Sequence, residues 1–307
     1  MIYLGPAGIP TVSRERTTIG GIKCAAELKL TAFEVEFVKH VGMSNEKAEE
    51  AGRVAKELGV RLSVHCPYFV NLCSQEPGKL EASKRRILDS AERAFHLGAD
   101  VAVFHPGFYG LLSHDAAFKA VEDACRNMLD RMRVNGIKGV RLGLETTGKV
   151  SQFGRLDEIV KLCKKVKGCT PVVDFSHIYA RQAGRINYDW IFEKLKPLKL
   201  KHLHAHFTSM EWTPAKAPWE GNERRHLELK VNKPPFEPLA REILKRKVNI
   251  TLISESPILE QDSLEMKRVF EKLGYEFNTS RSPRVFRPPI SSVISRVRGS
   301  GIAPRLW

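Results

Sequence analysis

The sequence predicts an α/β protein of the TIM-barrel type, (β/α)8, and three observations support this prediction. Short apolar segments alternate with amphipathic segments of helical period, as in a parallel sheet that is covered by helices. Eight apolar segments fall within roughly the first 275 residues, which suits a TIM barrel of ~250 residues. A residue that can bind metal stands at the exit of most of these segments.

The predicted elements follow one another closely along the chain. In order, they are strands over 1–5 and 32–38, a helix over 44–59, a strand over 60–65, a helix over 80–98, a strand over 99–105, a helix over 114–134, a strand over 139–145, a helix over 156–168, and strands over 169–174, 200–207 and 249–255. Ser44 is the N-cap of the first of these helices, and Gly59 ends it in the left-handed conformation. A doubly wound sheet would gather its functional residues at one switch point, so the barrel is preferred.

The chain divides into a predicted barrel domain over 1–277 and a predicted tail over 278–307. The tail contains six arginines and no acidic residue, and it is rich in Ser, Pro and Gly. This composition favours a flexible segment that becomes ordered only on contact with a partner.

The chain is strongly basic. It has 50 Lys and Arg residues and 35 Asp and Glu residues, which gives a net charge of +15 and a pI near 9.6. This excess favours a polyanionic partner, most often nucleic acid, although a basic soluble enzyme fits the charge as well.

The sequence also favours a cytoplasmic protein. Its first residues, MIYLGPAGIP, lack the basic start and the long apolar stretch of a secretory signal peptide. No apolar run reaches the length of a membrane span, so no membrane contact is expected. The six cysteines form no CxxC pair, which is typical of free thiols in a reducing compartment.

Potential metal ligands follow the predicted strands where each strand ends. They are His65, His105, Glu145, Asp174 with His177, the histidines at 202, 204 and 206, and Glu255. A hydrogen bond or a helix cap would explain any one of them. Many buried imidazoles and carboxylates at one barrel mouth are costly unless a positive partner neutralises them. Divalent zinc, manganese or iron suits this set of donors.

Six of these segments together resemble a known family. HCPY, FHPG, LETTG, VVDFSHIYA, HAHF and ISESP occur in this order over roughly residues 1–275, and they resemble the motifs of endonuclease IV, the metal-dependent apurinic/apyrimidinic endonucleases. The resemblance implies a TIM barrel with a trinuclear zinc site at its mouth. It also implies cleavage of the phosphodiester 5′ to an abasic site in double-stranded DNA, leaving a 3′-hydroxyl. A cytoplasmic, nucleoid-associated monomer without a nucleotide cofactor is expected.

The resemblance assigns roles to residues at matching positions. His65 and His105 would bind one zinc ion, and Glu145 would bridge this ion to a second. Asp174 and Glu255 would bind the second ion together with one histidine. Glu145, Asp174 and Glu255 are therefore the expected catalytic residues, because carboxylates at a pair of ions set the spacing and orient the attacking hydroxide. Two or three Zn²⁺ ions are expected, with Mn²⁺ or Fe²⁺ as alternatives.

The histidine of the second ion has three candidates on one strand face. His202, His204 and His206 alternate with apolar residues in KHLHAHF, so their side chains point the same way. His204 is preferred because HAHFTS aligns best with the corresponding segment of the family. His202 and His206 remain possible, and His206 is kept as a weaker candidate.

The third metal site departs from the family pattern. His177 is its first expected ligand, and the family completes the site with an Asp-x-His pair in a following loop. This sequence has GNERRHLE there, so the candidates are Glu223 and His226, which are spaced one residue wider. The sequence therefore leaves open a two-metal enzyme or an altered third site.

The loop after the strand that ends at His65 is the expected DNA contact. Tyr68 and Phe69 form an aromatic pair at a basic mouth, which can fill the gap that an extruded nucleotide leaves in the duplex. Asn71 is expected to fix the turn of this loop.

Two rival functions stay open. A metal-dependent sugar isomerase or epimerase on the same barrel could use Glu145, Asp174, His177 and Glu255. A DNA-binding relative that has lost catalysis through its altered 223–226 loop is the second rival. The extra ligands His65 and His105, the aromatic pair and the charge of +15 favour the endonuclease.

Overall fold

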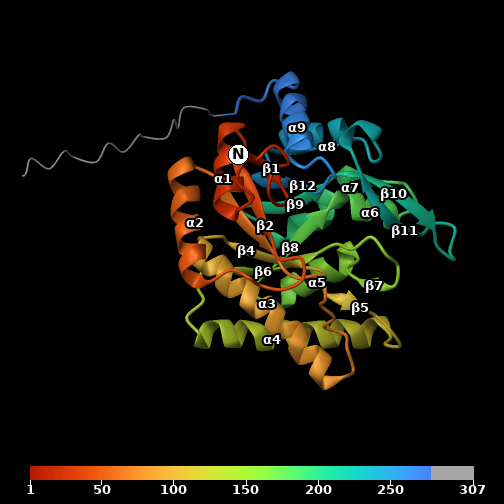
Figure 1. Cartoon of the computed structure of the whole chain (residues 1–307). Coiled ribbons are helices and arrows are strands. Elements are labelled where there is room, and N and C mark those ends of the chain that lie inside the picture. The colour runs from red at the N-terminus through yellow and green to blue at the C-terminus, as the bar shows by residue number, and fades with distance from the viewer. Residues whose placement is uncertain (278–307) are drawn as a thin grey trace, which may run out of the picture.

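The predicted TIM barrel is confirmed by the computed structural model, which describes residues 1–277. Eight parallel strands form the barrel wall, and helices surround it (Figure 1). The strands, in spatial order, are β1 (Ile2–Pro6), β12 (Ile250–Ser254), β9 (Leu203–Phe207), β8 (Cys169–Asp174), β6 (Arg141–Glu145), β4 (Val101–Phe104), β3 (Arg61–His65) and β2 (Ala32–Glu36). The predicted tail over 278–307 lies outside the described residues.

Main-chain hydrogen bonds between β1 and β2 bring the two ends of the sheet together. The N–H of Thr31 donates to the carbonyl of Leu4 (3.0 Å), and the N–H of Gly8 donates to the carbonyl of Glu34 (2.9 Å). A Cβ atom on Gly5 would lie 1.8 Å from the carbonyl oxygen of Ala32. Glycine is therefore required in the first strand, because only its bare backbone allows this approach.

Nine α-helices of the described region cover the outside of the barrel or connect its strands. They are α1 (Thr18–Glu27), α2 (Asn45–Leu58), α3 (Pro77–Leu97), α4 (His114–Val134), α5 (Leu156–Lys165), α6 (Phe175–Arg181), α7 (Tyr188–Leu195), α8 (Phe236–Arg246) and α9 (Glu260–Lys272). The predicted caps of α2 are confirmed: the hydroxyl of Ser44 accepts from the N–H of Lys47, and Gly59 has φ 70°. Among the described residues, no helix combines the length and the apolar character needed to cross a membrane.

The apolar core lies mainly between the strands and the helices, and this leaves the barrel axis free for polar groups. Val101, Val103 and Val172 form a small separate cluster of buried apolar side chains. Buried carboxylates and imidazoles also occupy β2, β3, β6, β8 and β9. Such polar groups at the C-terminal ends of barrel strands are typical of an active site.

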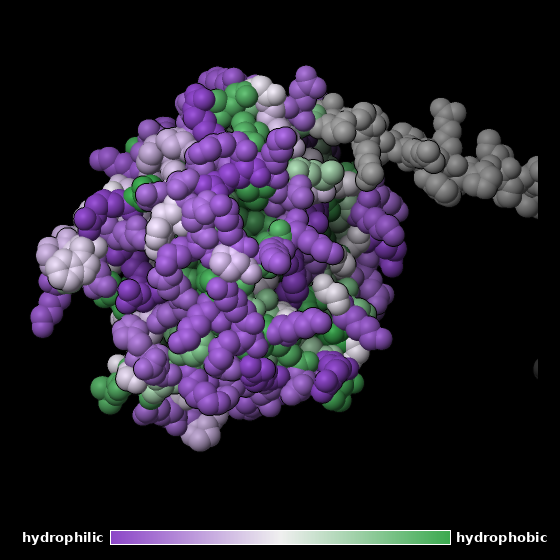
Figure 2. All heavy atoms as spheres, turned by 180° about the vertical axis from the view of Figure 1, so that it is seen from behind, coloured by the Kyte–Doolittle hydropathy of each residue, from purple (hydrophilic) through white to green (hydrophobic). Residues whose placement is uncertain are grey.

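Two small antiparallel pairs stand beyond the barrel wall. The hairpin of β10 (Ser209–Pro214) and β11 (Gly221–Leu227) projects from the molecule, and β5 (Gly107–Phe108) pairs with β7 (Gln152–Phe153) (Figure 1). Short 3₁₀ helices follow α7 and β11, at Lys196–Leu198 and Leu229–Val231. On the face opposite that of Figure 1, hydrophilic side chains predominate and apolar ones are scattered (Figure 2).

Candidate metal centre

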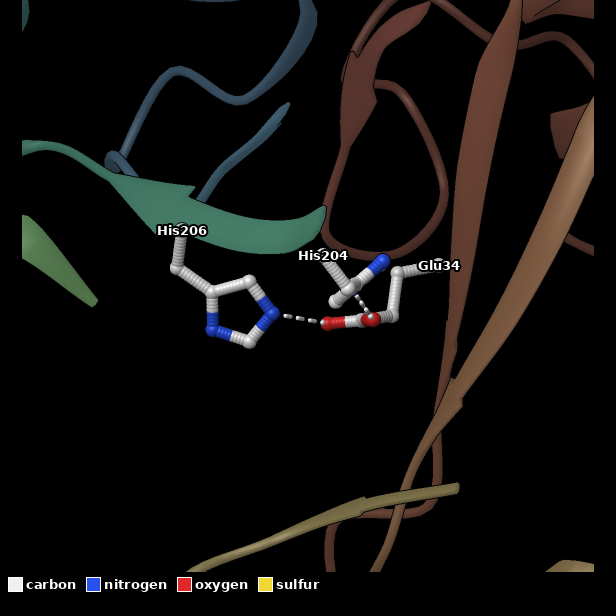
Figure 3. Close-up of side chains that lie close together, drawn as sticks. All are labelled: Glu34, His204 and His206. Atoms are coloured by element: carbon white, nitrogen blue, oxygen red, sulfur yellow. Dashed lines mark hydrogen bonds and ion pairs between the residues drawn. The ribbon is translucent and has the colours of Figure 1, made fainter. Parts of the chain in front are cut away.

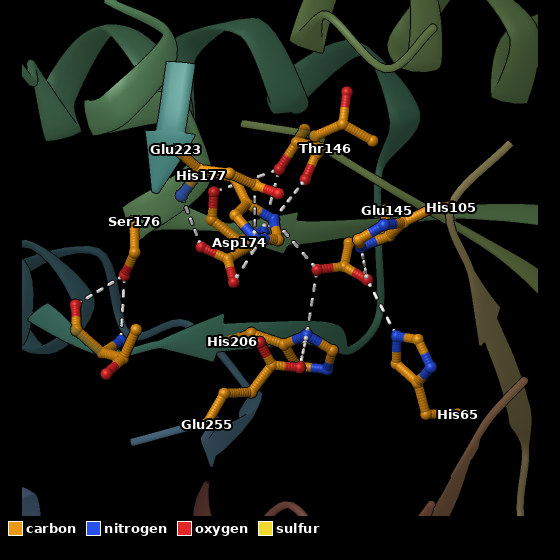
Figure 4. Close-up of polar contacts among 12 residues, drawn as sticks. His65, His105, Glu145, Thr146, Asp174, Ser176, His177, His206, Glu223 and Glu255 are labelled. Carbon is orange, nitrogen blue, oxygen red and sulfur yellow. Dashed lines mark hydrogen bonds and ion pairs between the residues drawn. The ribbon is translucent and has the colours of Figure 1, made fainter. Parts of the chain in front are cut away.

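The first group of potential ligands is formed by His65 at the end of β3, His105 just after β4 and Glu145 at the end of β6 (Figure 4). Nε2 of His65 lies 3.1 Å from Oε2 of Glu145, and Nε2 of His105 lies 3.0 Å from the same oxygen. Glu145 is fully buried. The structure thus brings together the three residues that the sequence predicted for the first ion.

The second group contains Glu145, Asp174, His206 and Glu255. Nδ1 of His206 lies 3.2 Å from Oε1 of Glu145 and 3.0 Å from Oε1 of Glu255. The two oxygens of Glu145 therefore face different groups. His206 occupies the place that the sequence analysis gave to His204, so that placement needs correction.

Local helix capping explains the positions of Asp174 and His177. Asp174 is the N-cap of α6, and its Oδ1 accepts a hydrogen bond from the N–H of His177 at 2.7 Å. The Nδ1–H of His177 donates to the carbonyl of Thr146 (2.9 Å), and its Nε2 lies 3.1 Å from Oε2 of Glu223. The sequence D-F-S-H thus places a carboxylate and an imidazole on the same side of one helix start.

A β-bulge in β11 explains the unusual spacing of Glu223 and His226. Trp212 of β10 pairs with Glu223, and Met210 pairs with His226, with an irregularity at Glu211 that leaves Arg224 as the extra residue. Because Met210 and Trp212 are two residues apart, their partners lie on the same face of the hairpin. The wider spacing in the sequence therefore still directs both candidate ligands to one side.

Glu34 and Glu36 of β2 are functional candidates that the sequence analysis missed. Glu34 is fully buried, and its oxygens lie 2.9 Å from Nε2 of His204 and 2.9 Å from Nε2 of His206 (Figure 3). Glu36 is two residues further along the same strand. The signal was present in AFEVEFV, where two carboxylates share one face of an otherwise apolar strand.

The charges of these groups depend on one another. Burial alone would raise the pKa of Glu145, but His105 and His206 outweigh it and hold this pKa well below its ordinary value. Burial also opposes protonation of His206, but Glu255 and other carboxylates raise the pKa of His206 well above its ordinary value. Burial, with Glu255 and Glu145, raises the pKa of Asp174. Protons on the imidazoles therefore balance the carboxylates in the metal-free protein, and bound cations would displace them.

The residues present fit divalent cations. Oδ2 of Asp174 and Oε2 of Glu223 are buried and accept no hydrogen bond from any described residue. Such oxygens are costly unless a cation neutralises them. His65, His177 and His226 each donate Nδ1–H to a main-chain carbonyl, which leaves the Nε2 lone pair free to bind metal. Nitrogen and carboxylate donors of this kind suit zinc, manganese or iron.

The aromatic pair of the β3–α3 loop is exposed beside the metal centre. Tyr68 is 56% exposed and Phe69 64% exposed, and the ring of Tyr68 lies 5.7 Å from that of His65. Asn71 fixes the loop: its Oδ1 accepts hydrogen bonds from the N–H groups of Cys73 and Phe108, both at 3.1 Å. The carboxamide oxygen of Asn71 is thus engaged within the loop, whereas the two aromatic rings are exposed.

A pocket of about 490 Å³ opens next to the ligand groups. Its lining includes Gly8, Arg16, Glu36, Tyr68, His226 and Glu255. The pocket therefore brings Glu255 and His226 next to the exposed Tyr68, and a substrate bound there would reach these two candidate metal ligands.

Comparisons with known proteins identify the family of this chain. A model of the xylose isomerase-like TIM barrel family matches residues 22–273. An uncharacterized protein of Methanocaldococcus jannaschii is 31% identical over 89% of this chain and 98% of its own length. A probable endonuclease 4 of Mycoplasma mobile is 26% identical over 77% of this chain and 84% of its own length. The predicted resemblance to the endonuclease IV family is confirmed.

Solved structures of two kinds share the fold. The crystal structure of endonuclease IV from Thermus thermophilus superposes with a TM-score of 0.64 and 22% identity, covering 87% of this chain and 98% of its own. The crystal structure of a D-tagatose 3-epimerase-like protein gives a TM-score of 0.62 and 18% identity, covering 87% and 96%. At these identities the two structures support the barrel fold, and the choice between their chemistries depends on the site.

Proposed function

Because the chain belongs to the xylose isomerase-like TIM barrel family, we propose that it is a metal-dependent endonuclease acting on abasic sites in double-stranded DNA. It hydrolyses the phosphodiester 5′ to the abasic site and leaves a 3′-hydroxyl. The observation that carries this proposal is Glu145, whose two oxygens face two separate groups of imidazole and carboxylate ligands. A carboxylate between two cations suits the two-metal mode of phosphodiester hydrolysis, in which paired ions stabilise the attacking and the leaving oxygen.

The ligands divide among the ions by proximity. His65, His105 and Glu145 would hold the first ion, and Glu145, Asp174, His206 and Glu255 the second. A third ion would use His177 and His226 with Glu255, whose ligand atoms lie within 4.8 Å of one another, or with Glu223, whose Oε2 lies 3.1 Å from Nε2 of His177. Zn²⁺ is the proposed metal, with Mn²⁺ or Fe²⁺ as alternatives that the same donors accept.

The protein residues have separate tasks in hydrolysis. Bound divalent ions supply an activated water and neutralise the charge of the phosphodiester. Glu145 sets the distance between the two ligand groups. Glu255 and Asp174 belong to the second ligand group, and Oδ2 of Asp174 has no hydrogen-bonding partner among the described residues. These carboxylates would orient the attacking water and accept its proton.

DNA recognition is proposed for the exposed loop and the basic surface. The ring of Tyr68 lies 5.7 Å from that of His65, and it and the ring of Phe69 are exposed, so they could stack on the bases that flank an extruded abasic sugar. The excess of 15 positive charges would attract the phosphate backbone and make binding depend on salt.

A sugar epimerase is the second candidate. It is favoured by the second ligand group, because Glu145, Asp174, His206 and Glu255 alone could hold a single metal ion at a pocket. The first group argues for the endonuclease, because His65 and His105 add a second set of ligands that a one-metal enzyme does not need.

A duplex with one abasic site tests the proposal directly. Purified protein loaded with Zn²⁺ is expected to cut this duplex 5′ to the lesion and to leave an intact duplex uncut. Metal content is measured on the same preparation, and at least two ions per chain are expected. Binding of the duplex without cutting would support the catalytically impaired relative, and conversion of a ketohexose without cutting would support the epimerase.

A further inference from the structure

Three histidines of the metal centre share one hydrogen-bonding arrangement. His65 donates from Nδ1 to the carbonyl of Cys66, His177 to that of Thr146, and His226 to that of Glu255, each at 2.9 Å. Each donation places a proton on Nδ1 and leaves Nε2 to bind a cation.

His206 has the opposite arrangement. Its Nδ1 faces the carboxylates of Glu145 and Glu255, so Nδ1 is the nitrogen available to a cation. Its Nε2 points away from them and lies 2.9 Å from Oε1 of Glu34. Both of these atoms are buried, and neither makes a hydrogen bond with a described residue, so the ion-pair contact is what links them.

Glu34 is itself held in place from two sides. Its Oε2 accepts hydrogen bonds from the hydroxyl of Ser63 on β3 (2.6 Å) and from Nε2 of His204 (2.9 Å). Glu34, His204 and His206 are 0%, 4% and 0% exposed, so water does not compete for these contacts. The carboxylate is therefore fixed on its far side and offers Oε1 to His206.

We propose that Glu34 is a positioning residue for the metal centre, which keeps the proton of His206 on Nε2 and its Nδ1 lone pair directed at the second ion. Glu34 does for His206 what main-chain carbonyls do for the other three histidines. A carboxylate in this place also raises the electron density of the imidazole and strengthens its bond to metal. His204 then serves to hold Glu34, and the inference rests on the metal centre of the proposed function.

Replacement of the carboxylate tests this role. In Glu34→Gln the amide is of similar size but carries no charge. Its NH₂ group must face either Nε2 of His206 or the two donors Ser63 and His204, so it cannot accept hydrogen bonds on both sides as the carboxylate does. The zinc ion bound by His206 is expected to bind about 10–100-fold more weakly in this variant. Losses of this size are typical when the hydrogen-bonding partner of a metal-bound histidine is replaced. Glu34→Asp retains the carboxylate and is expected to restore part of the affinity.

Glu36→Gln is the matched control, because it makes the same carboxyl-to-amide change on the same face of the same strand. Zinc affinities are measured by competition with a chromophoric chelator, in the absence of DNA. The inference is overturned if Glu34→Gln and Glu36→Gln weaken binding equally, since general electrostatics would then explain the effect. It is also overturned if Glu34→Gln lowers only the melting temperature of the metal-free protein.

A measurement on the wild-type protein does not depend on any variant folding. In the zinc-loaded protein with ¹⁵N-labelled histidine, the His206 ring is expected to carry its proton on Nε2 alone. A proton on Nδ1 would contradict the inference. A wild-type protein that binds zinc but cuts no DNA would refute only the endonuclease, whereas one that binds no zinc would refute both.

Discussion

Glu145 is the single residue on which the proposed chemistry depends most, because its two oxygens face both main ligand groups. We expect Glu145→Gln to abolish incision and to lower the zinc content by at least one ion, since a neutral amide cannot bridge two cations. The barrel should still fold, which circular dichroism of the metal-free protein checks. Incision near the wild-type rate at saturating zinc would remove Glu145 from the mechanism.

Glu36 makes the stability of the metal-free protein depend on pH. Burial, with the nearby Glu34 and Glu255, raises the pKa of Glu36 from an ordinary value of 4.5 to about 8. The folded protein therefore holds this proton more tightly than the unfolded chain. The resulting stabilisation is complete below pH 4.5 and is lost as the pH rises through 8.

Between pH 5 and pH 8 the free energy of unfolding of the wild-type protein should fall as the pH rises. We expect Glu36→Gln to reduce this slope by at most about 1.4 kcal/mol per pH unit, the contribution of one titrating group. Urea unfolding of the chelator-treated proteins at several pH values measures the effect. A smaller decline above pH 6.5 should remain in the variant. In wild type, Glu36, Glu145 and Glu34 raise the pKa of His65 to about 10 against the effect of burial, and the variant keeps the last two of these carboxylates. Parallel curves for the two proteins would show that Glu36 is not the titrating group.

The β10–β11 hairpin is the element that decides whether a third ion can bind. Its bulge at Arg224 keeps Glu223 and His226 on one face although they are three residues apart. Deletion of Arg224 would turn the segment into a regular strand with Glu and His two residues apart, which still places both on one face. We therefore expect the deletion variant to retain its full zinc content.

Insertion of one alanine after Arg225 provides the contrast, because it moves His226 out of register with Met210. This variant is expected to lose one zinc ion. Metal analysis after dialysis compares the two variants with wild type. Loss of the ion in the deletion variant and retention in the insertion variant would contradict the proposed role of the bulge.

The β3–α3 loop is the second element with a testable role. We expect the double change Tyr68→Ala and Phe69→Ala to weaken binding of an abasic duplex more than that of an intact duplex. Each ring could contribute about 1–3 kcal/mol by stacking, whereas binding of intact DNA depends mainly on charge. Equal reductions on both duplexes, measured by fluorescence anisotropy, would assign these exposed rings to packing within the loop.

The charge of the whole molecule suggests a role for residues 278–307, which lie outside the described structure. Truncation at residue 277 removes six arginines and no acidic residue, so the net charge falls from +15 to +9. We propose that this segment clamps DNA without sequence preference. Truncation should leave the rate at saturating DNA unchanged and reduce the slope of log affinity against log salt by about 0.9 for each phosphate group that the protein no longer neutralises. An unchanged slope with a lower melting temperature would indicate packing onto the barrel instead.

The sequence by itself determined the barrel and most of the positions at its mouth. Helices and apolar strands are recognised from local sequence patterns, and the residue at which an apolar pattern stops marks the C-terminal end of its strand. His65, His105, Glu145, Asp174 and Glu255 could therefore be placed near one another without coordinates. In a parallel barrel all strands end at the same end of the barrel. Residues at the C-terminal ends of the strands therefore lie near one another, and the sequence shows where the strands end.

Only the tertiary structure decided which of these residues face one another. His204 and His206 share a strand face, but only His206 reaches Glu145 and Glu255. Glu34 contacts both histidines from a strand about 170 residues earlier in the chain. A single sequence does not show which side chains Glu34 contacts, nor that a bulge realigns His226. Both depend on how neighbouring strands stagger and on which side chains then fill the barrel axis, and these are properties of the packed molecule.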